Sequence, residues 1–175
     1  MTRSLGSTDL KRLHREWRRQ APGRLGLVLD SVATPANVGS IIRSAATQRV
    51  DDLWVCGQTA DPASSGVGRM SMGTERYLTL HAVESAKDAV IAAQALGYRV
   101  VAVELAERAR PLHQVDLTGA VCLVVGHEER GITPAVLDAV DDVAFIPQLG
   151  RVGSLNVATA AAIALYEARR QGWPS

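Results

Sequence analysis

Strand-like and helix-like segments alternate along this chain of 175 residues, and that alternation restricts its fold more than any other feature. Short runs rich in β-branched and other apolar residues predict strands at residues 25–30, 52–57, 77–83, 98–104, 120–126 and 142–147. Segments whose apolar residues recur every three or four positions predict helices at residues 37–48, 84–97, 133–140 and 154–170. This order is typical of an α/β fold, in which helices cover both faces of a mostly parallel sheet.

The composition suits one domain with a sizeable core, because 47% of the residues are hydrophobic and 21% are charged. The sequence contains no run of 18 apolar residues, so no membrane span is predicted, and the N-terminus is too polar for a signal peptide. We therefore expect a cytoplasmic protein without a membrane partner. Cys56 and Cys122 each lie in a strand-like run without a CxxC motif or a nearby histidine, so we expect two buried thiols and no metal site.

Positive charge is concentrated at the N-terminus. Residues 1–24 contain seven basic and two acidic residues, a net charge of +5, which leaves −4 for the rest of a chain whose total is +1. Such a segment suits a polyanionic partner, because each neutralised phosphate releases counterions. We expect a basic arm or helix here, with Arg15, Arg18 and Arg19 as candidate contacts; a solvated basic helix is the alternative. Trp17 is expected either to stack on a base or to anchor the segment to the body.

Polar residues follow the first predicted strand, where ligand sites of parallel sheets usually lie. Pro35 ends that strand, and Asn37 stands where a helix N-cap belongs. Arg43 lies opposite the apolar stripe of the following helix, and Gly39, one turn earlier, leaves space beside its guanidinium. These residues are either parts of a site or simply a cap and an exposed charge.

Two later loops carry similar features. In "LVVGHEERGIT" (123–133) a strand runs into Gly126, which would let backbone approach a ligand, and Glu128 then belongs either to a solvated turn or to a site. In the third loop Ser154 is expected to cap the last helix, because it directly follows a glycine. Asn156 is then expected inside a helix that is apolar nearly all round, where a buried amide must find partners.

Several common catalytic signatures are missing from the sequence. No GxGxxG follows the first strand and no GK[ST] phosphate loop occurs, which disfavours dinucleotide-binding and P-loop enzymes. HExxH, GxSxG and CxxC are also absent, so neither metal catalysis nor nucleophilic hydrolysis has a recognisable motif.

Taken together, the three loops resemble those of the SpoU (TrmH-like) branch of the SPOUT RNA methyltransferases. The first family motif, N-x-G-x-x-x-R, matches Asn37, Gly39 and Arg43, and the second, G-x-E-x-x-G, matches Gly126, Glu128 and Gly131. The third, I-P followed by an S-L-N-V helix that ends near Y-E, matches Ile146, Pro147, Ser154, Leu155, Asn156, Val157, Tyr166 and Glu167. The match covers residues 25–170 in order, and "GHEERGIT", with "GTERY" upstream, looks most like tRNA (guanosine-2′-O-)methyltransferases that modify the D-loop.

The resemblance implies a single SPOUT methyltransferase domain over residues 25–175, with a deep trefoil knot at its C-terminal end. It implies S-adenosylmethionine as cofactor, tRNA or another structured RNA as partner, and a homodimer whose RNA site is completed across the interface. The positions that match the family's cofactor contacts are Val103, Gly126, Ile146, Ser154 and Leu155.

The reaction implied is methyl transfer to a ribose 2′-OH, which needs a basic or charge-stabilising group at that oxygen. The resemblance gives this role to Arg43, either as a base assisted by an RNA phosphate or as a clamp for the forming alkoxide. Asn37, Glu128 and Asn156 would orient Arg43 and the ribose, and Ser154 would help to hold the knot and the cofactor. Alternatives are rRNA or another tRNA position as substrate, or a non-catalytic RNA-binding relative, against which the complete polar set argues.

Overall fold

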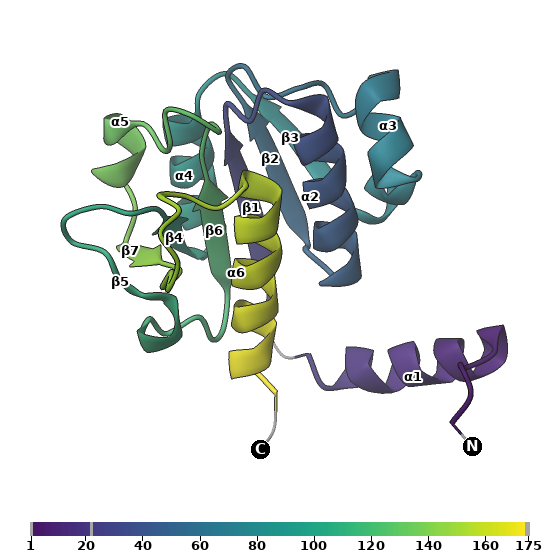
Figure 1. The fold of residues 1–175 in the computed structure, drawn as a ribbon. Coiled ribbons are helices and arrows are strands. Elements are labelled where there is room, and N and C mark those ends of the chain that lie inside the picture. Colours follow the sequence, from purple (N-terminus) through teal and green to yellow (C-terminus); the bar gives the residue numbers. More distant parts are fainter. Residues whose placement is uncertain (1, 22, 174–175) are drawn as a thin grey trace.

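A computed structural model describes residues 2–21 and 23–173, and within them seven strands form one sheet in the order β3-β2-β1-β6-β4-β7-β5 (Figure 1). Every pair of neighbouring strands is parallel. The bounds are β1 (Leu25–Asp30), β2 (Asp52–Cys56), β3 (Thr79–Val83), β4 (Arg99–Val103), β5 (Arg110–Pro111), β6 (Val121–Val125) and β7 (Asp142–Phe145). The predicted parallel sheet is confirmed, and the two-residue β5 comes from a segment for which no strand was predicted.

Helices cover both faces of this sheet, as predicted (Figure 1). On one face α2 (Pro35–Thr47) and α6 (Val157–Gln171) pack with Leu25, Leu27 and Leu29 of β1. On the other face α4 (Ala86–Ala95) and α5 (Pro134–Leu137) share a second cluster with Val28 of the same strand. Successive strand residues point to opposite faces, so a strand that is apolar at every position serves both layers.

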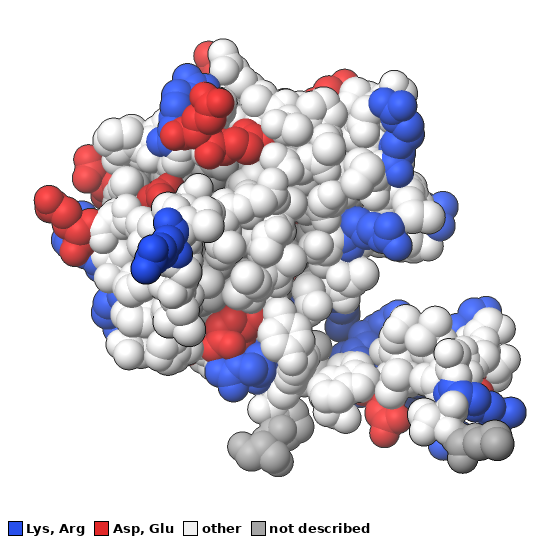
Figure 2. Space-filling model, in the orientation of Figure 1, with Lys and Arg blue, Asp and Glu red and all other residues white. Residues whose placement is uncertain are grey.

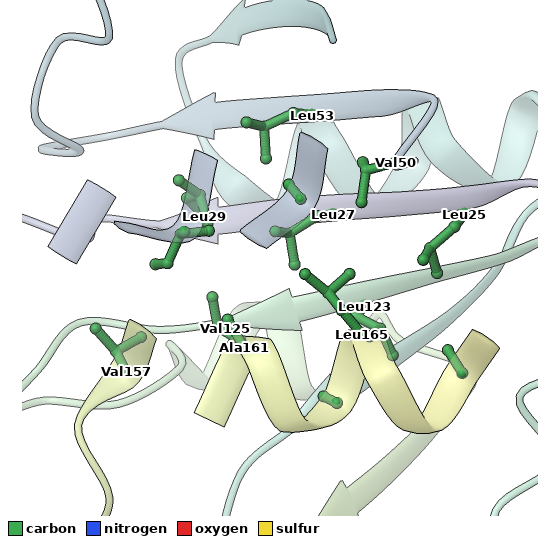
Figure 3. Close-up of a cluster of buried hydrophobic side chains, with 14 of the residues drawn as sticks. Leu25, Leu27, Leu29, Val50, Leu53, Leu123, Val125, Val157, Ala161 and Leu165 are labelled. Atoms are coloured by element: carbon green, nitrogen blue, oxygen red, sulfur yellow. The ribbon is translucent and has the colours of Figure 1, made fainter. Parts of the chain in front are cut away.

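The α6 helix lies close against the middle of the sheet (Figure 3). Leu165 and Ala161 point from this helix towards Leu123 of β6 and Leu27 of β1, and all four side chains are fully buried. A small side chain at position 161 lets the helix backbone approach the strands closely. Cys56 and Cys122 are buried free thiols in the core on the opposite face, as expected.

The segment between β2 and β3 departs from the sequence prediction. No helix was predicted there, but it contains helix α3 (Ser65–Ser71) and the 3₁₀ helix η1 (Thr74–Tyr77). Helix α3 packs against α2 at Gly39, where an added Cβ would lie 2.5 Å from the carbonyl oxygen of Val67. The expectation that Gly39 leaves space beside Arg43 is therefore wrong, because α3 fills that space.

The basic N-terminal segment contains helix α1 (Ser7–Arg19), which has no buried residue and extends away from the body beside the C-terminal end of α6 (Figure 1). The rings of Trp17 and Trp173 meet there, with centroids 5.0 Å apart. Of the two roles expected for Trp17, this contact corresponds to the anchoring one. No helix in the described ranges is long and apolar enough to cross a membrane.

Candidate active site

A pocket of about 220 Å³ opens where β4, β6 and β7 end. Such a place is expected for a ligand site in a parallel sheet. The structure brings all five predicted cofactor positions into its lining: Val103, Gly126, Ile146, Ser154 and Leu155. That these residues bind a cofactor stays a prediction.

Glu128 connects the loop after β6 to the start of α2. Its carboxylate accepts hydrogen bonds from Nδ2 of Asn37 at 2.8 Å, from the N–H of Thr34 at 3.0 Å and from the N–H of Ala33 at 3.2 Å. Burial favours the neutral acid and would raise the pKa of Glu128, but the bonds from Asn37 and Thr34 to the charged form outweigh it and lower that pKa to about 2. Glu128 is therefore a placed, ionised carboxylate rather than part of a solvated turn.

Asn156 extends this network to α6. Its Nδ2 donates to Oδ1 of Asn37 at 3.0 Å, while its own Oδ1 accepts from the N–H groups of Ala158 at 2.9 Å and Thr159 at 3.2 Å. Asn156 is thus the N-cap of α6 and is exposed. The expectation of a buried amide inside the helix is wrong, because the helix begins three residues later than predicted. We call the linked side chains of Asn37, Asn156 and Glu128 the polar network.

Two other capping assignments are also corrected. The N-cap of α2 is Thr34, and Asn37 lies in the first helical turn, where its side chain is free to bond Glu128 instead of its own helix. Ser154 precedes α6 without capping it and lines the pocket. Both errors arise because each loop offers two residues that are able to cap, and the sequence does not show which one the helix starts from.

The loop after β6 folds tightly on itself. His127 and Gly131 exchange backbone hydrogen bonds of 3.0 and 2.9 Å, and an added Cβ at Gly126 would lie 2.3 Å from the carbonyl carbon of Gly131. Gly131 itself has a φ of +66°. The glycines of this motif are therefore required by the turn, and at Gly126 the backbone of its own loop approaches closely.

Acidic side chains surround the pocket. Glu104, Glu128 and Glu129 are all in its lining, and Figure 2 shows acidic atoms gathered on the upper part of the body next to a basic cluster. The sequence reasoning missed Glu104, whose carboxylate accepts from the N–H groups of Leu105 and Ile132. The same rule that selected Glu128, an acid directly after a buried strand, would have found it. Three carboxylates favour a positively charged ligand.

Arg43 lies outside the polar network. It is exposed on α2, and no hydrogen bond or ion pair to another described residue holds its guanidinium. The candidate RNA contacts Arg15, Arg18 and Arg19 are farther away, on α1. Helix α6 starts at the pocket and spans about 22 Å, so α1, beside its far end, does not border the pocket of its own chain (Figure 1).

Comparison with known proteins gives consistent matches. The family model described as the SpoU rRNA Methylase family matches residues 24–166. An uncharacterized tRNA/rRNA methyltransferase from Synechocystis sp. is 34% identical over 90% of this chain and 57% of that protein. A tRNA (guanosine(18)-2′-O)-methyltransferase from Thermus thermophilus is 32% identical over 92% of this chain and 81% of that protein. Among solved structures, the AdoMet-bound rRNA methyltransferase from Sinorhizobium meliloti superposes with a TM-score of 0.80 at 32% identity.

The chain spans 57% of the length of the Synechocystis protein and 57% of the length of the Sinorhizobium protein, less than two thirds in each case. The match to the Sinorhizobium protein covers 86% of this chain. The matched region nevertheless contains the whole sheet, the pocket and the polar network. The resemblance drawn from the three motifs is thus confirmed, and the chain belongs to the SpoU rRNA methylase family.

Proposed function

We propose that the chain is an S-adenosylmethionine-dependent RNA 2′-O-ribose methyltransferase. The observation that carries the proposal is the polar network, which joins the starts of α2 and α6 to Glu128 at the rim of the pocket. Its three members come from the three family motifs, which are far apart in the sequence. A network that served only to hold two helix ends together would not need to lie beside a ligand pocket.

The chemistry of the pocket fits the cofactor. S-Adenosylmethionine has a positively charged sulfonium and ammonium, which suit the acidic lining, and a flat adenine, which suits the apolar side chains of Val103, Ile146 and Leu155. When bound, the cofactor supplies a methyl group activated by its sulfonium. The loops after β4, β6 and β7 would hold it through the five predicted positions.

Arg43 is the residue we assign to the ribose. It lies six residues along α2 from Asn37, about 9 Å along the helix axis, and its exposed guanidinium is available to an incoming RNA. Arginine stays protonated in proteins, so its own chemistry favours stabilising the alkoxide that forms at O2′, and a nearby RNA phosphate could accept the proton. The polar network would act as a positioning device, because it fixes the end of the helix that carries Arg43.

The substrate we propose is tRNA, at a D-loop guanosine. The Thermus relative, which this chain matches over most of both lengths, is named for tRNA guanosine(18), and the "GHEERGIT" loop has the form found in that class. Ribosomal RNA is the second candidate, since the Sinorhizobium neighbour is an rRNA methyltransferase. With either substrate, we propose a cytoplasmic protein.

A homodimer and a C-terminal trefoil knot complete the proposal. The dimer is supported by apolar side chains that one chain leaves exposed. Those near the pocket are Leu149, Val152 and Leu155, and those on α6 are Ile163 and Tyr166. For the knot, support comes from the path of the chain, because after β7 it returns across the sheet to pack α6 against β6 and α2.

Methylation of unfractionated tRNA with labelled S-adenosylmethionine, followed by mapping of the 2′-O-methyl position, tests this function. The purified protein should label a tRNA guanosine, and Arg43→Ala should lower turnover about 100-fold or more with cofactor affinity unchanged. Lys87→Ala removes an exposed charge from α4, which covers the opposite face of the sheet from α2, and is the control. Full activity of Arg43→Ala would rule out the role of Arg43, and absence of transfer to both tRNA and rRNA would rule out the enzyme.

A further inference from the structure

An exposed aromatic–arginine pair lies at the end of η1, in the "GTERY" segment, and nothing in the proposed site uses it. Tyr77 is 65% exposed, and the guanidinium of Arg76 lies over its ring, 4.8 Å from the centroid. Nη2 of Arg76 also donates to the Tyr77 hydroxyl at 2.9 Å. Met70 and Met72, in α3 and at its C-cap, are also exposed. We call the Arg76–Tyr77 pair the η1 platform.

The segment that carries the η1 platform is firmly held. Ser71 is fully buried, and its hydroxyl donates to Oε2 of Glu75 at 2.7 Å. The Thr74 hydroxyl donates to the carbonyl oxygen of Ser71, also at 2.7 Å. These bonds fix the turn between α3 and η1, so the Arg76–Tyr77 pair is presented in one orientation and would lose little conformational entropy on binding.

The surroundings of the η1 platform are basic. Between residues 65 and 77 the exposed charges are Arg69 and Arg76, while the single acid, Glu75, is directed towards Ser71. Figure 2 shows basic atoms on the side of the body formed by α3. A basic surface with an exposed ring fits a nucleic-acid strand better than an apolar protein face, which would leave these guanidinium groups unpaired.

Arg43 links this surface to the proposed site. Gly39 and Arg43 are four residues apart and so share one face of α2, and at Gly39 this face packs against α3. Helix α2 also contacts η1. The guanidinium of Arg43 therefore emerges on the side of α2 where α3 and η1 lie, between the pocket rim and the η1 platform.

We propose that the η1 platform stacks an unpaired nucleobase of the RNA, at a position other than the target nucleotide. This inference rests on the proposed function, because the RNA must reach Arg43. Stacking on an aromatic ring that an arginine already flanks is a common way to hold unpaired bases. Helix η1 directly precedes β3 and therefore lies at the edge of the sheet where the parallel strands begin, whereas the pocket lies where strands end. The base on the platform is therefore distinct from the target.

Equilibrium binding of fluorescently labelled tRNA at several salt concentrations tests the proposal. Tyr77→Ala should weaken binding roughly 5- to 100-fold without changing the salt dependence, because it removes a stacking surface and no charge. Tyr77→Phe keeps the ring and should bind within about threefold of the unmodified protein. Arg76→Ala should lower both the affinity and the salt dependence. Ile91→Ala, which removes an exposed side chain from α4, is the control.

Several outcomes would overturn the proposal. One is a Tyr77→Ala variant whose affinity for tRNA equals that of the unmodified protein. Another is a Tyr77→Phe variant whose affinity is as low as that of Tyr77→Ala. A change of oligomeric state in Tyr77→Ala, with unchanged RNA affinity, would identify a protein contact instead. Methyl transfer by the unmodified protein is measured in parallel, because failure of transfer contradicts the proposed function, whereas intact transfer with unaffected variants contradicts the platform alone.

Discussion

Glu128 is the residue whose ionisation the polar network depends on. Replacing it with glutamine keeps one acceptor oxygen but turns an NH₂ group either towards the N–H of Ala33 or towards the donors of Thr34 and Asn37, so we expect Glu128→Gln to lose about 1–3 kcal/mol of stability at neutral pH. The pKa of Glu128 is lowered from 4.5 to about 2 in the fold, so its contribution is complete above pH 4.5 and is lost as the pH falls towards 2.

Urea denaturation of both proteins across this pH range measures the effect. The difference in unfolding free energy should be constant near neutral pH and should shrink steadily below pH 4.5. A difference that does not depend on pH would show that the ionised carboxylate is not what stabilises the network.

Asn156 has two roles that substitution can separate. Asn156→Asp keeps an acceptor for the N–H groups of Ala158 and Thr159 but loses the bond donated to Asn37, so stability should stay nearly unchanged while turnover falls about 10- to 100-fold. Ser85→Ala removes the N-cap of α4, away from the pocket, and should cost about 1 kcal/mol with no loss of turnover. Thermal unfolding measures the stability of each variant, and steady-state kinetics measures its turnover. Equal losses of turnover in Asn156→Asp and Ser85→Ala would contradict a positioning role.

The membership of the polar network could be predicted, but its geometry could not. Each member (Asn37, Glu128 and Asn156) lies next to the carboxyl end of a strand or at the start of a helix, where polar residues of parallel sheets often belong to a ligand site. Which residue caps which helix depends on where each helix begins, and a shift of three residues at α6 moves Asn156 from the interior to the cap. Arg43 could be selected only through the family motif, because an exposed arginine on a helix is unremarkable by itself.

At the scale of elements, buried strands were found to within one or two residues, because a parallel strand covered on both faces reads as a continuous apolar run. Helix α3 was missed because "SGVGRMS" contains two glycines, which disfavour a helix in isolation. Its stability comes from packing on α2 at Gly39, a contact between segments more than 20 residues apart that no local pattern reports.

Helix α1 is the element to which we assign affinity for RNA without specificity. Replacing Arg15, Arg18 and Arg19 with alanine should weaken tRNA binding and reduce the slope of log K against log salt by about 2–3. Alanine preserves the helix, and α1 lies away from the pocket of its own chain, so turnover at saturating tRNA should persist. The double variant Lys87→Ala/Arg108→Ala removes exposed charge elsewhere and is the control. A triple variant with the original affinity and slope would show that α1 is only a solvated basic helix.

The whole molecule leaves one face of α6 uncovered, and its assembly can be tested there. Ile163 and Tyr166 lie on this face, 39% and 50% exposed, and a second copy of the chain would bury them. Ile163→Glu should be tolerated by a single chain, because glutamate suits an exposed helix, but it would place a charge in the dimer interface and weaken association more than about 100-fold. Ile91→Glu makes the same change on the exposed side of α4 and should leave the dimer intact.

Sedimentation over a range of protein concentrations distinguishes the outcomes of this last prediction. If the RNA site is completed by the second copy, the methyl-transfer activity of Ile163→Glu should rise with protein concentration, following the fraction of dimer, whereas Ile91→Glu should show constant specific activity. An unmodified protein that remains monomeric at micromolar concentration would refute the homodimer. A fully active monomeric Ile163→Glu would instead separate assembly from catalysis, and the pocket and polar network of one chain would then be sufficient for the reaction.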